Sequence, residues 1–217
     1  MRAPRFVLRI GIHLPHLTIF GGVGPVNTRA NKASDIELNL EGILRLFLNE
    51  GPRWVRDQRS QHRPLGRALS VNEKTRLAPF FEERILDEAR LRHVPVIQNP
   101  PFYAALSAPG VPIPLDFTLM SGITFDDTIL LSEQCPVETA SQLGLLFHEL
   151  VHVVQFKRAG IEGFVERYVL GWAENDFTYE RIPLEAQAYA LGARFSADPS
   201  SGFSVHAEVN VLLGVVS

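Results

Sequence analysis

Apolar residues recur at spacings of three and four along one stretch of the chain, which predicts a helix with a broad buried face. These residues are Leu143, Leu146, Phe147, Leu150, Val151 and Val154. Pro136 suits the first turn of such a helix, Glu138 places negative charge at its positive end, and Gly160 is typical of a left-handed C-terminal stop. The pattern predicts a core helix from about Pro136 to Arg158.

The first part of the chain predicts one amphipathic helix followed by a basic stretch. Ser34 and Glu37 have capping-box spacing, and the apolar residues that follow repeat at helical intervals up to Gly51. Arginines are then frequent between positions 53 and 67. A nucleic-acid patch is one interpretation, but the stretch is short and the rest of the chain is acidic, so a solvated linker is favoured. Residues 1–67 are expected to form an N-terminal appendage.

The middle of the chain predicts a second helix and a small sheet. Ser70 and Glu73 again have capping-box spacing ahead of a helical pattern. Residues 94–97 favour a short strand, and residues 121–133 favour a strand or hairpin. Because residues 99–116 are rich in proline, they predict an irregular loop.

The last part of the chain predicts a short helix, a link and an apolar end. A helix is expected to begin near Pro183 and to stop or loosen at Gly192. Residues 205–216 are apolar enough for a strand or a docking segment. The expected organisation is therefore an α+β main domain over residues 68–196 and a C-terminal tail over residues 197–217.

Composition narrows the class of protein. The chain has 217 residues, of which 46% are hydrophobic and 21% are charged, enough to bury a full core. A net charge of −3 gives no sign of nucleic-acid binding. No run of about 18 apolar residues and no clear signal peptide are present, so we expect a cytoplasmic protein with no membrane partner. The sequence carries no signal for an oligomeric state.

The single cysteine, Cys135, excludes an internal disulfide framework. Since it precedes the predicted core helix closely, a thiolate that blocks a metal is one interpretation. A plain loop cysteine is favoured.

The predicted core helix contains the pentad His148-Glu149-Leu150-Val151-His152. Residues four apart lie on one face of a helix, so both imidazoles can converge on one metal ion. Glu149 lies about 100° round the helix, near a metal-bound water rather than necessarily on the metal. This H-E-x-x-H pattern is the signature of zinc hydrolases.

A catalytic zinc site needs a third protein ligand and an open position for water. Glu185 lies in the first turn of the helix predicted to begin near Pro183. If that short helix packs antiparallel to the first, it delivers the carboxylate to the ion. We therefore expect His148, His152 and Glu185 to bind Zn²⁺.

These motifs carry a resemblance to a known group. H-E-L-V-H-V-V-Q at 148–155 with L-E-A-Q-A-Y at 184–189 resembles the gluzincin zinc metallopeptidases, and more narrowly short uncharacterised bacterial zincin-like domains. The likeness covers about residues 68–196. It implies a zincin fold, with a small β-sheet, an active-site helix, a second helix carrying the glutamate ligand, and Glu149 as catalytic base and acid. One departure is Tyr189, where such proteins often have an aspartate that supports a histidine.

The resemblance also implies a substrate and the groups that bind it. A peptide or protein would be hydrolysed, and the strand within residues 121–133 would be an edge strand to which an extended peptide adds. An ordinary core strand is the other interpretation. Related enzymes use a tyrosine or histidine downstream of the ligands to stabilise the oxyanion. Candidates are Tyr168, Tyr179, Tyr189 and His206, and each also fits a purely structural role.

Three functions remain open. A zinc peptidase is favoured because motif, helix context and downstream carboxylate agree. A zinc-binding scaffold without proteolytic activity is the alternative, supported by Tyr189. A metal-free domain whose histidines are satisfied core groups, or a different metal hydrolase, is the third.

Overall fold

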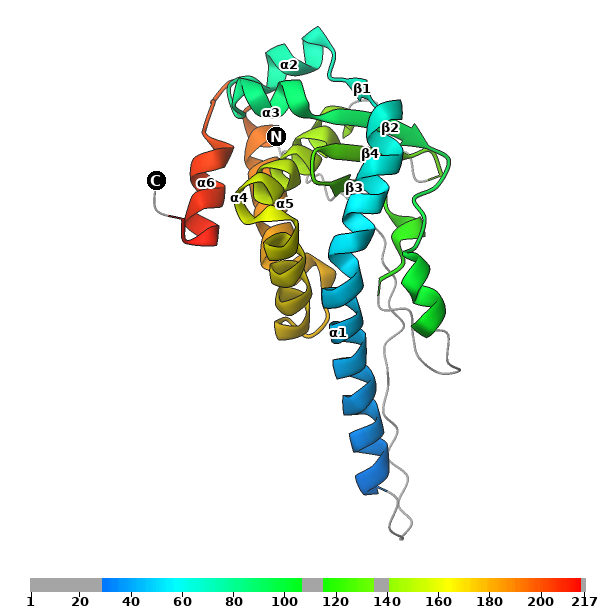
Figure 1. Ribbon diagram of the computed structural model, residues 1–217. Helices are drawn as coiled ribbons and strands as arrows, with labels where there is room; N and C mark the ends of the chain where they lie inside the picture. Colours follow the sequence, from blue (N-terminus) through cyan, green and yellow to red (C-terminus); the bar gives the residue numbers. More distant parts are fainter. Residues whose placement is uncertain (1–28, 107–114, 135–140, 216–217) are drawn as a thin grey trace, which may run out of the picture.

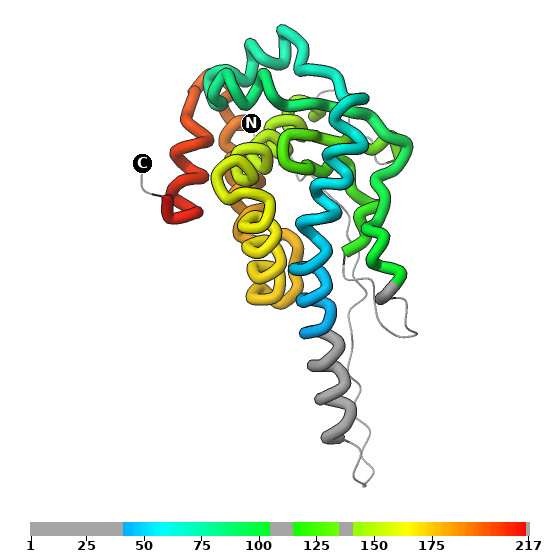
Figure 2. The backbone as a smooth tube through the Cα atoms, viewed as in Figure 1, coloured from blue at the N-terminus to red at the C-terminus, as the bar shows by residue number. Residues whose placement is uncertain are grey.

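The structure, a computed structural model, describes residues 29–106, 115–134 and 141–215, and the side chains of 29–40 and 105–106 are not described. It is a mixed α+β fold in which helices surround a small four-stranded sheet (Figures 1 and 2). Cys135, Pro136 and Glu138 lie outside the described residues, so the predictions made for them stay predictions. No helix within the described ranges is long and apolar enough to cross a membrane.

The sheet has the strand order β1-β2-β4-β3, with β1 at Arg67–Ala68, β2 at Arg90–Val94, β3 at Gly122–Phe125 and β4 at Thr128–Ser132. Strands β2 and β4 are parallel, and the other pairs are antiparallel. The hairpin predicted within residues 121–133 is confirmed, and its outer strand, β3, lies at an edge of the sheet.

The strand predicted at residues 94–97 is wrong, because β2 ends at Val94. Pro95 has no amide hydrogen and cannot continue the ladder. Strand β2 contains the polar residues Arg90, Arg92 and His93, and only Leu91 and Val94 are buried. Its sequence therefore lacks the apolar pattern from which a strand is predicted.

Helix α4 (Gln142–Glu174) is the centre of the molecule and contains residues 142–158 of the predicted core helix, whose expected start at Pro136 lies outside the described residues. Every residue from Leu145 to Phe156 is buried, so this part is covered on all sides. The backbone leaves helical geometry at Gly160, with φ 72° and ψ 168°, as the predicted stop requires. The chain is helical again beyond this kink, so Gly160 separates two helical halves of α4, and the stop predicted there is confirmed. Phe164 and Trp172 of the second half are buried.

Helix α1 (Arg29–His62) differs most from expectation. It begins before Ser34 and runs through Pro52, so both predicted ends are wrong, and residues 53–62 are helical rather than a linker. A Cβ atom at Gly51 would lie 2.9 Å from a methyl group of Val165, so this glycine allows close packing on α4 instead of ending a helix. The boundary after residue 67 stays a prediction, although α1 packs against α4.

The remaining helices flank α4. They are α2 (Val71–Leu77), α3 (Glu83–Glu88), α5 (Pro183–Ala197) and α6 (Val205–Leu213), with short 3-10 turns at Arg63–Leu65, Pro101–Leu106, Phe117–Leu119 and Tyr179–Arg181. In Figure 1, α4 lies between α6 on one side and α1 on the other.

Two predictions for the C-terminal part are wrong. Helix α5 continues through Gly192, because the cost of about 1 kcal/mol for one glycine is small beside tertiary packing. The segment expected to be a strand or docking segment forms the helix α6, which packs on α4, so only the strand is wrong. Its signals are Ser204, whose hydroxyl accepts a hydrogen bond from the amide of Ala207, and Gly214, which ends the helix with φ 67°.

The capping box predicted at Ser70 and Glu73 is confirmed at the start of α2. Hydrogen bonds from Arg67 and Ser70 outweigh burial and hold the pKa of Glu73 at about 2, against its ordinary 4.5. Because the folded pKa is depressed, this carboxylate stabilises the fold fully above pH 4.5, and its contribution is lost as the pH falls towards 2.

We therefore expect Glu73→Gln to unfold at lower urea concentration than the wild type at pH 6, with the difference shrinking between pH 4.5 and pH 2. Urea unfolding at several pH values measures it. Glu83→Gln is the matched control, since Glu83 lies in the first turn of α3, where no side-chain cap bond forms. A difference between Glu73→Gln and wild type that is independent of pH would contradict the expectation.

Candidate metal centre

Two helices bring the predicted ligands together. His148 and His152 lie one turn apart in the buried half of α4, and Glu185 lies in the first turn of α5. All three are at most 6% exposed. A Cβ atom at Gly171 would lie 2.6 Å from the Pro183 ring, so glycine at this position lets the start of α5 approach α4 closely. This close approach helps to place Glu185 beside the histidines.

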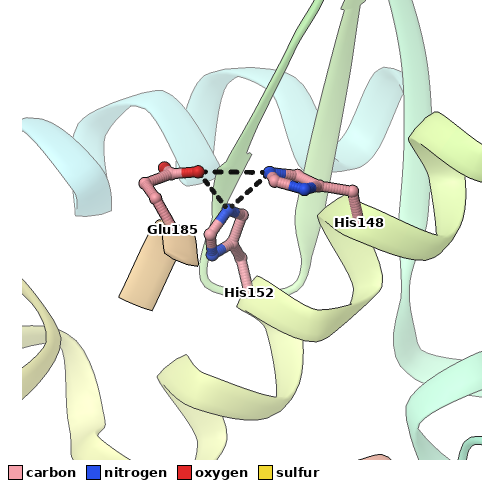
Figure 3. Close-up of side chains that lie close together, drawn as sticks. All are labelled: His148, His152 and Glu185. Atoms are coloured by element: carbon pink, nitrogen blue, oxygen red, sulfur yellow. Dashed lines mark hydrogen bonds and ion pairs between the residues drawn. The ribbon is translucent and has the colours of Figure 1, made fainter. Parts of the chain in front are cut away.

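The three ligand atoms form a small triangle (Figure 3). The distances are 3.1 Å between the two Nε2 atoms, 3.2 Å from His148 Nε2 to Glu185 Oε2, and 3.4 Å from His152 Nε2 to Glu185 Oε2. Ligands of a tetrahedral zinc ion at about 2.0–2.1 Å lie about 3.3–3.4 Å apart. The triangle therefore has the dimensions of one face of such a site, and these residues fit a zinc ion.

The buried carboxylate of Glu185 favours a positive charge beside it. Its Oε1 accepts a hydrogen bond of 2.9 Å from the Tyr168 hydroxyl, while its buried Oε2 accepts none. Burial alone would raise the pKa of Glu185, but the two histidines lower it by more, so the net shift is downward and the group is a carboxylate. Burial alone would lower the pKa of His152, but the neighbouring Glu185 carboxylate more than offsets this effect and raises the pKa to about 9. The carboxylate thus favours positive charge at the centre of the triangle, carried either by a proton or by a metal ion.

Gln155, one turn beyond His152, sets the orientation of that imidazole. The Gln155 amide nitrogen donates to the Leu184 carbonyl at 3.0 Å, so its oxygen faces His152 Nδ1 at 2.8 Å. The Nδ1 atom must then be the donor, and the lone pair of a neutral His152 lies on Nε2, directed into the triangle. Gln155 provides a support of the kind expected from the aspartate that Tyr189 replaces.

Glu149 lies against the edge strand β3 rather than in the triangle. Its Oε2 accepts a hydrogen bond of 2.7 Å from Thr124, and the same hydroxyl lies 3.1 Å from the Glu149 carbonyl oxygen. A Cβ atom at Gly122 would lie 2.6 Å from Oε1, so any other residue at this position would displace the Glu149 carboxylate. Burial raises the pKa of Glu149 in spite of the neighbouring histidines. A raised pKa suits a group that both accepts and returns a proton near neutral pH.

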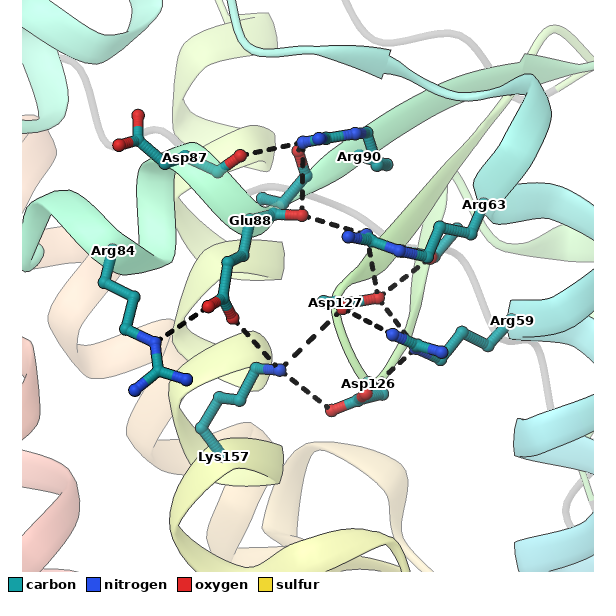
Figure 4. Close-up of polar contacts among 11 residues, drawn as sticks. Arg59, Arg63, Arg84, Asp87, Glu88, Arg90, Asp126, Asp127 and Lys157 are labelled. Atoms are coloured by element: carbon teal, nitrogen blue, oxygen red, sulfur yellow. Dashed lines mark hydrogen bonds and ion pairs between the residues drawn. The ribbon is translucent and has the colours of Figure 1, made fainter.

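Charged side chains from three elements hold the β3–β4 hairpin in place (Figure 4). Arg59 of α1 donates to Asp127 at 2.9 Å and 2.8 Å, and Arg63 lies 3.2 Å from the same carboxylate. Lys157 of α4 lies 3.8 Å from both Asp126 and Asp127. Burial raises the pKa of Asp127, but hydrogen bonds and charge from Arg59 lower it overall. The network connects α1, the hairpin and α4.

Asp127→Asn is expected to destabilise the fold by about 1.5–3 kcal/mol, because it removes the buried carboxylate that accepts hydrogen bonds from the partly exposed Arg59 and neutralises its pairing with Arg63. Urea unfolding measures the loss. Asp57→Asn is the control, since Asp57 is 68% exposed and its ion pair with Arg53, 3.8 Å long, is a surface pair worth about 1 kcal/mol or less. Equal effects of the two substitutions would show that the network does not stabilise the fold.

The proposed oxyanion donors fall into two places. Tyr168 donates to Glu185, the Tyr189 ring lies 4.6 Å from the His148 ring, and Tyr179 interacts with both tyrosines. Burial, followed by the charge of Glu185, raises the pKa of all three, so they keep their protons. His206 instead lies on α6, with Nε2 3.5 Å from Glu82, away from this cluster.

A cavity opens beside the cluster. Glu149, His152 and Glu185 line one part of it, and α1, β3 and the second half of α4 supply most of the remaining wall. The cavity gives a substrate group a place next to the proposed reacting centre.

Sequence reasoning missed the residues that support the site. Gln155 was visible as the last letter of H-E-L-V-H-V-V-Q, one helical turn beyond the second histidine. Thr124 and Gly122 had no such signal, because their contacts with Glu149 depend on how the edge strand β3 packs on α4.

Comparison with known proteins adds nothing to this site: no protein-family model, no curated protein and no solved structure matches the chain.

Proposed function

We propose that this chain is a zinc metallopeptidase of zincin-like architecture that hydrolyses peptide bonds. The observation that carries the proposal is the triangle of His148 Nε2, His152 Nε2 and Glu185 Oε2, with edges of 3.1–3.4 Å and a buried carboxylate oxygen that accepts no hydrogen bond. Two imidazoles and one carboxylate are the ligand set of many catalytic zinc sites. Zn²⁺ is preferred over iron, which also binds such sets, because of the H-E-x-x-H spacing.

The mechanism assigns separate tasks to the residues around the triangle. His148, His152 and Glu185 would hold a zinc ion, which would provide a Lewis acid for the substrate carbonyl and would lower the pKa of bound water to about 7. Glu149 takes the proton of the attacking water and passes it to the leaving amine. Thr124 holds the Glu149 carboxylate by its 2.7 Å hydrogen bond, which keeps the base in one position.

Substrate binding follows from the sheet. An extended peptide adds to β3 by backbone hydrogen bonds, because this strand lies at the sheet edge and carries Thr124 beside Glu149. Among the candidate oxyanion donors, Tyr168 and Tyr189 are the best placed, since they flank Glu185 and His148. Both keep a proton to donate.

The proposal is tested by metal loading and peptide cleavage. Purified protein is expected to bind one zinc ion per chain, to cleave members of a mixed peptide library, to lose cleavage when a chelator removes the metal, and to regain it with one equivalent of zinc. Mass spectrometry of the products identifies the bonds cleaved. A metal content far below one per chain that His148→Ala leaves unchanged would remove the basis of the proposal.

The alternative is a zinc-binding domain without proteolytic activity. It is favoured by the tight packing of Glu149, whose two carboxylate oxygens both contact β3, through Thr124 and against Gly122. One zinc ion per chain together with no cleavage of any library peptide would support this second function and reject the first.

A further inference from the structure

The cavity beside the metal cluster has two chemically distinct parts. Glu149, His152 and Glu185, with Thr124 and the hydroxyls of Tyr168 and Tyr179, supply its polar groups. The remaining wall is apolar and rich in aromatic rings, including those of Phe47, Trp54, Phe102, Phe117, Phe164 and Trp172. The cavity volume is about 100 Å³.

No lysine, arginine or aspartate among the described residues lines this cavity. A charged group that entered its apolar part would lose its hydration without gaining a partner, which costs several kcal/mol. An apolar group would gain about 25 cal/mol for each Å² that it removes from water. The cavity therefore favours apolar groups over charged ones, and it lies directly beside the proposed zinc ligands.

Helix α1 supplies part of the apolar wall, including the rings of Phe47 and Trp54. The Phe47 ring packs edge-on against the Phe102 ring, with 5.3 Å between the ring centroids. The centroid of the Trp54 ring lies 5.0 Å from those of Phe117 and Phe125. These contacts fix both α1 rings in the cavity wall. The ion pairs of Arg59 with Asp126 and Asp127 hold the same helix against the hairpin. Both aromatic residues precede position 68, outside the region that resembles zinc peptidases.

We propose that this cavity is the specificity pocket of the enzyme, that it takes a large apolar side chain next to the scissile peptide bond, and that Phe47 and Trp54 of α1 determine its size. The inference rests on the proposed function, because the scissile bond is defined by the metal cluster. The pocket adds the substrate class: peptides with an aromatic or branched aliphatic residue at that position.

The first part of the test measures cleavage. Three peptides that differ only at one residue beside the bond, phenylalanine, alanine or aspartate, are compared by kcat/KM with the zinc-loaded protein. We expect phenylalanine to be preferred over alanine by about tenfold or more, since each methylene in an apolar pocket is worth about 10- to 200-fold, and aspartate to be poorest. Equal rates for the three, or a preference for aspartate, would overturn the proposal.

The variants Phe47→Ala and Trp54→Ala widen the pocket. Each is expected to reduce the preference for phenylalanine over alanine at least about threefold and to improve cleavage of a peptide with the bulkier biphenylalanine at the same position. Phe203→Ala is the matched control, because Phe203 is also a half-buried aromatic residue but packs on Phe80 and Arg194, outside the cavity. Preferences that change equally in all three variants, or in none, would contradict the assignment.

A binding measurement separates this proposal from the peptidase itself. The neutral probe N-phenyl-1-naphthylamine is expected to fluoresce on binding to the zinc-loaded protein, to be displaced by the phenylalanine peptide but not by the alanine peptide, and to bind more weakly to Trp54→Ala. If these results hold while no peptide is cleaved, the pocket stands and the peptidase fails. If peptides are cleaved but the probe does not bind, the peptidase stands and the pocket fails.

Discussion

Zinc-loaded protein carrying Glu149→Gln is expected to cleave peptides about 10²–10⁴-fold more slowly than the wild type, the range that a positioned general base contributes. Glutamine has nearly the same shape, and its amide oxygen can still accept the hydrogen bond that Thr124 donates at 2.7 Å. It cannot take a proton from water. Zinc content should stay at one ion per chain, because Glu149 is not part of the ligand triangle.

Measurement of kcat/KM on one peptide, with metal analysis of the same samples, checks this expectation. Glu166→Gln provides the control, since Glu166 lies on the exposed side of the same helix, α4, and should leave both values unchanged. If Glu149→Gln retains full turnover with a full zinc content, another group transfers the proton. Loss of zinc together with activity would instead assign Glu149 a role in holding the metal.

The parts of the site that could be predicted from sequence are those that local geometry determines. His148 and His152 share a face because a helix repeats every 3.6 residues, and the apolar neighbours that predict the helix also predict its burial. The first-turn position of Glu185 follows in the same way from Pro183. The hairpin between β3 and β4 was visible from its β-favouring residues on either side of Asp126 and Asp127.

The parts that could not be predicted depend on contacts between segments distant in sequence. Gly51 and Pro52 favour the end of a helix locally, yet α1 continues because Gly51 packs closely on Val165 and Trp54 fills a space beside Phe125. Helix propensity is a weak term, and tertiary packing outweighs it. The wall of the cavity was missed for the same reason, since it requires α1 to lie against β3 and α4.

Glu185→Gln is expected to weaken zinc binding by more than about a hundredfold, beyond the range of about 10- to 100-fold for residues that only orient a ligand. The substitution removes the negative charge that balances the ion and one of three ligand atoms, while it keeps the hydrogen-bond acceptor for Tyr168. Competition with a chromophoric chelator measures the dissociation constant. Gln155→Met, which removes the hydrogen-bond partner of His152 Nδ1, should weaken zinc binding only about 10- to 100-fold.

The comparison of these two variants distinguishes a ligand from a supporting residue. Glu180→Gln is the control for loss of one negative charge, because Glu180 is exposed and lies just before α5. Unchanged zinc affinity in Glu185→Gln would show that the buried oxygen without a hydrogen bond does not bind the ion. The triangle would then be an internal ion pair between two histidines and a carboxylate, whose positive charge is a proton on His152, and the assignment of a metal centre to this fold would be wrong.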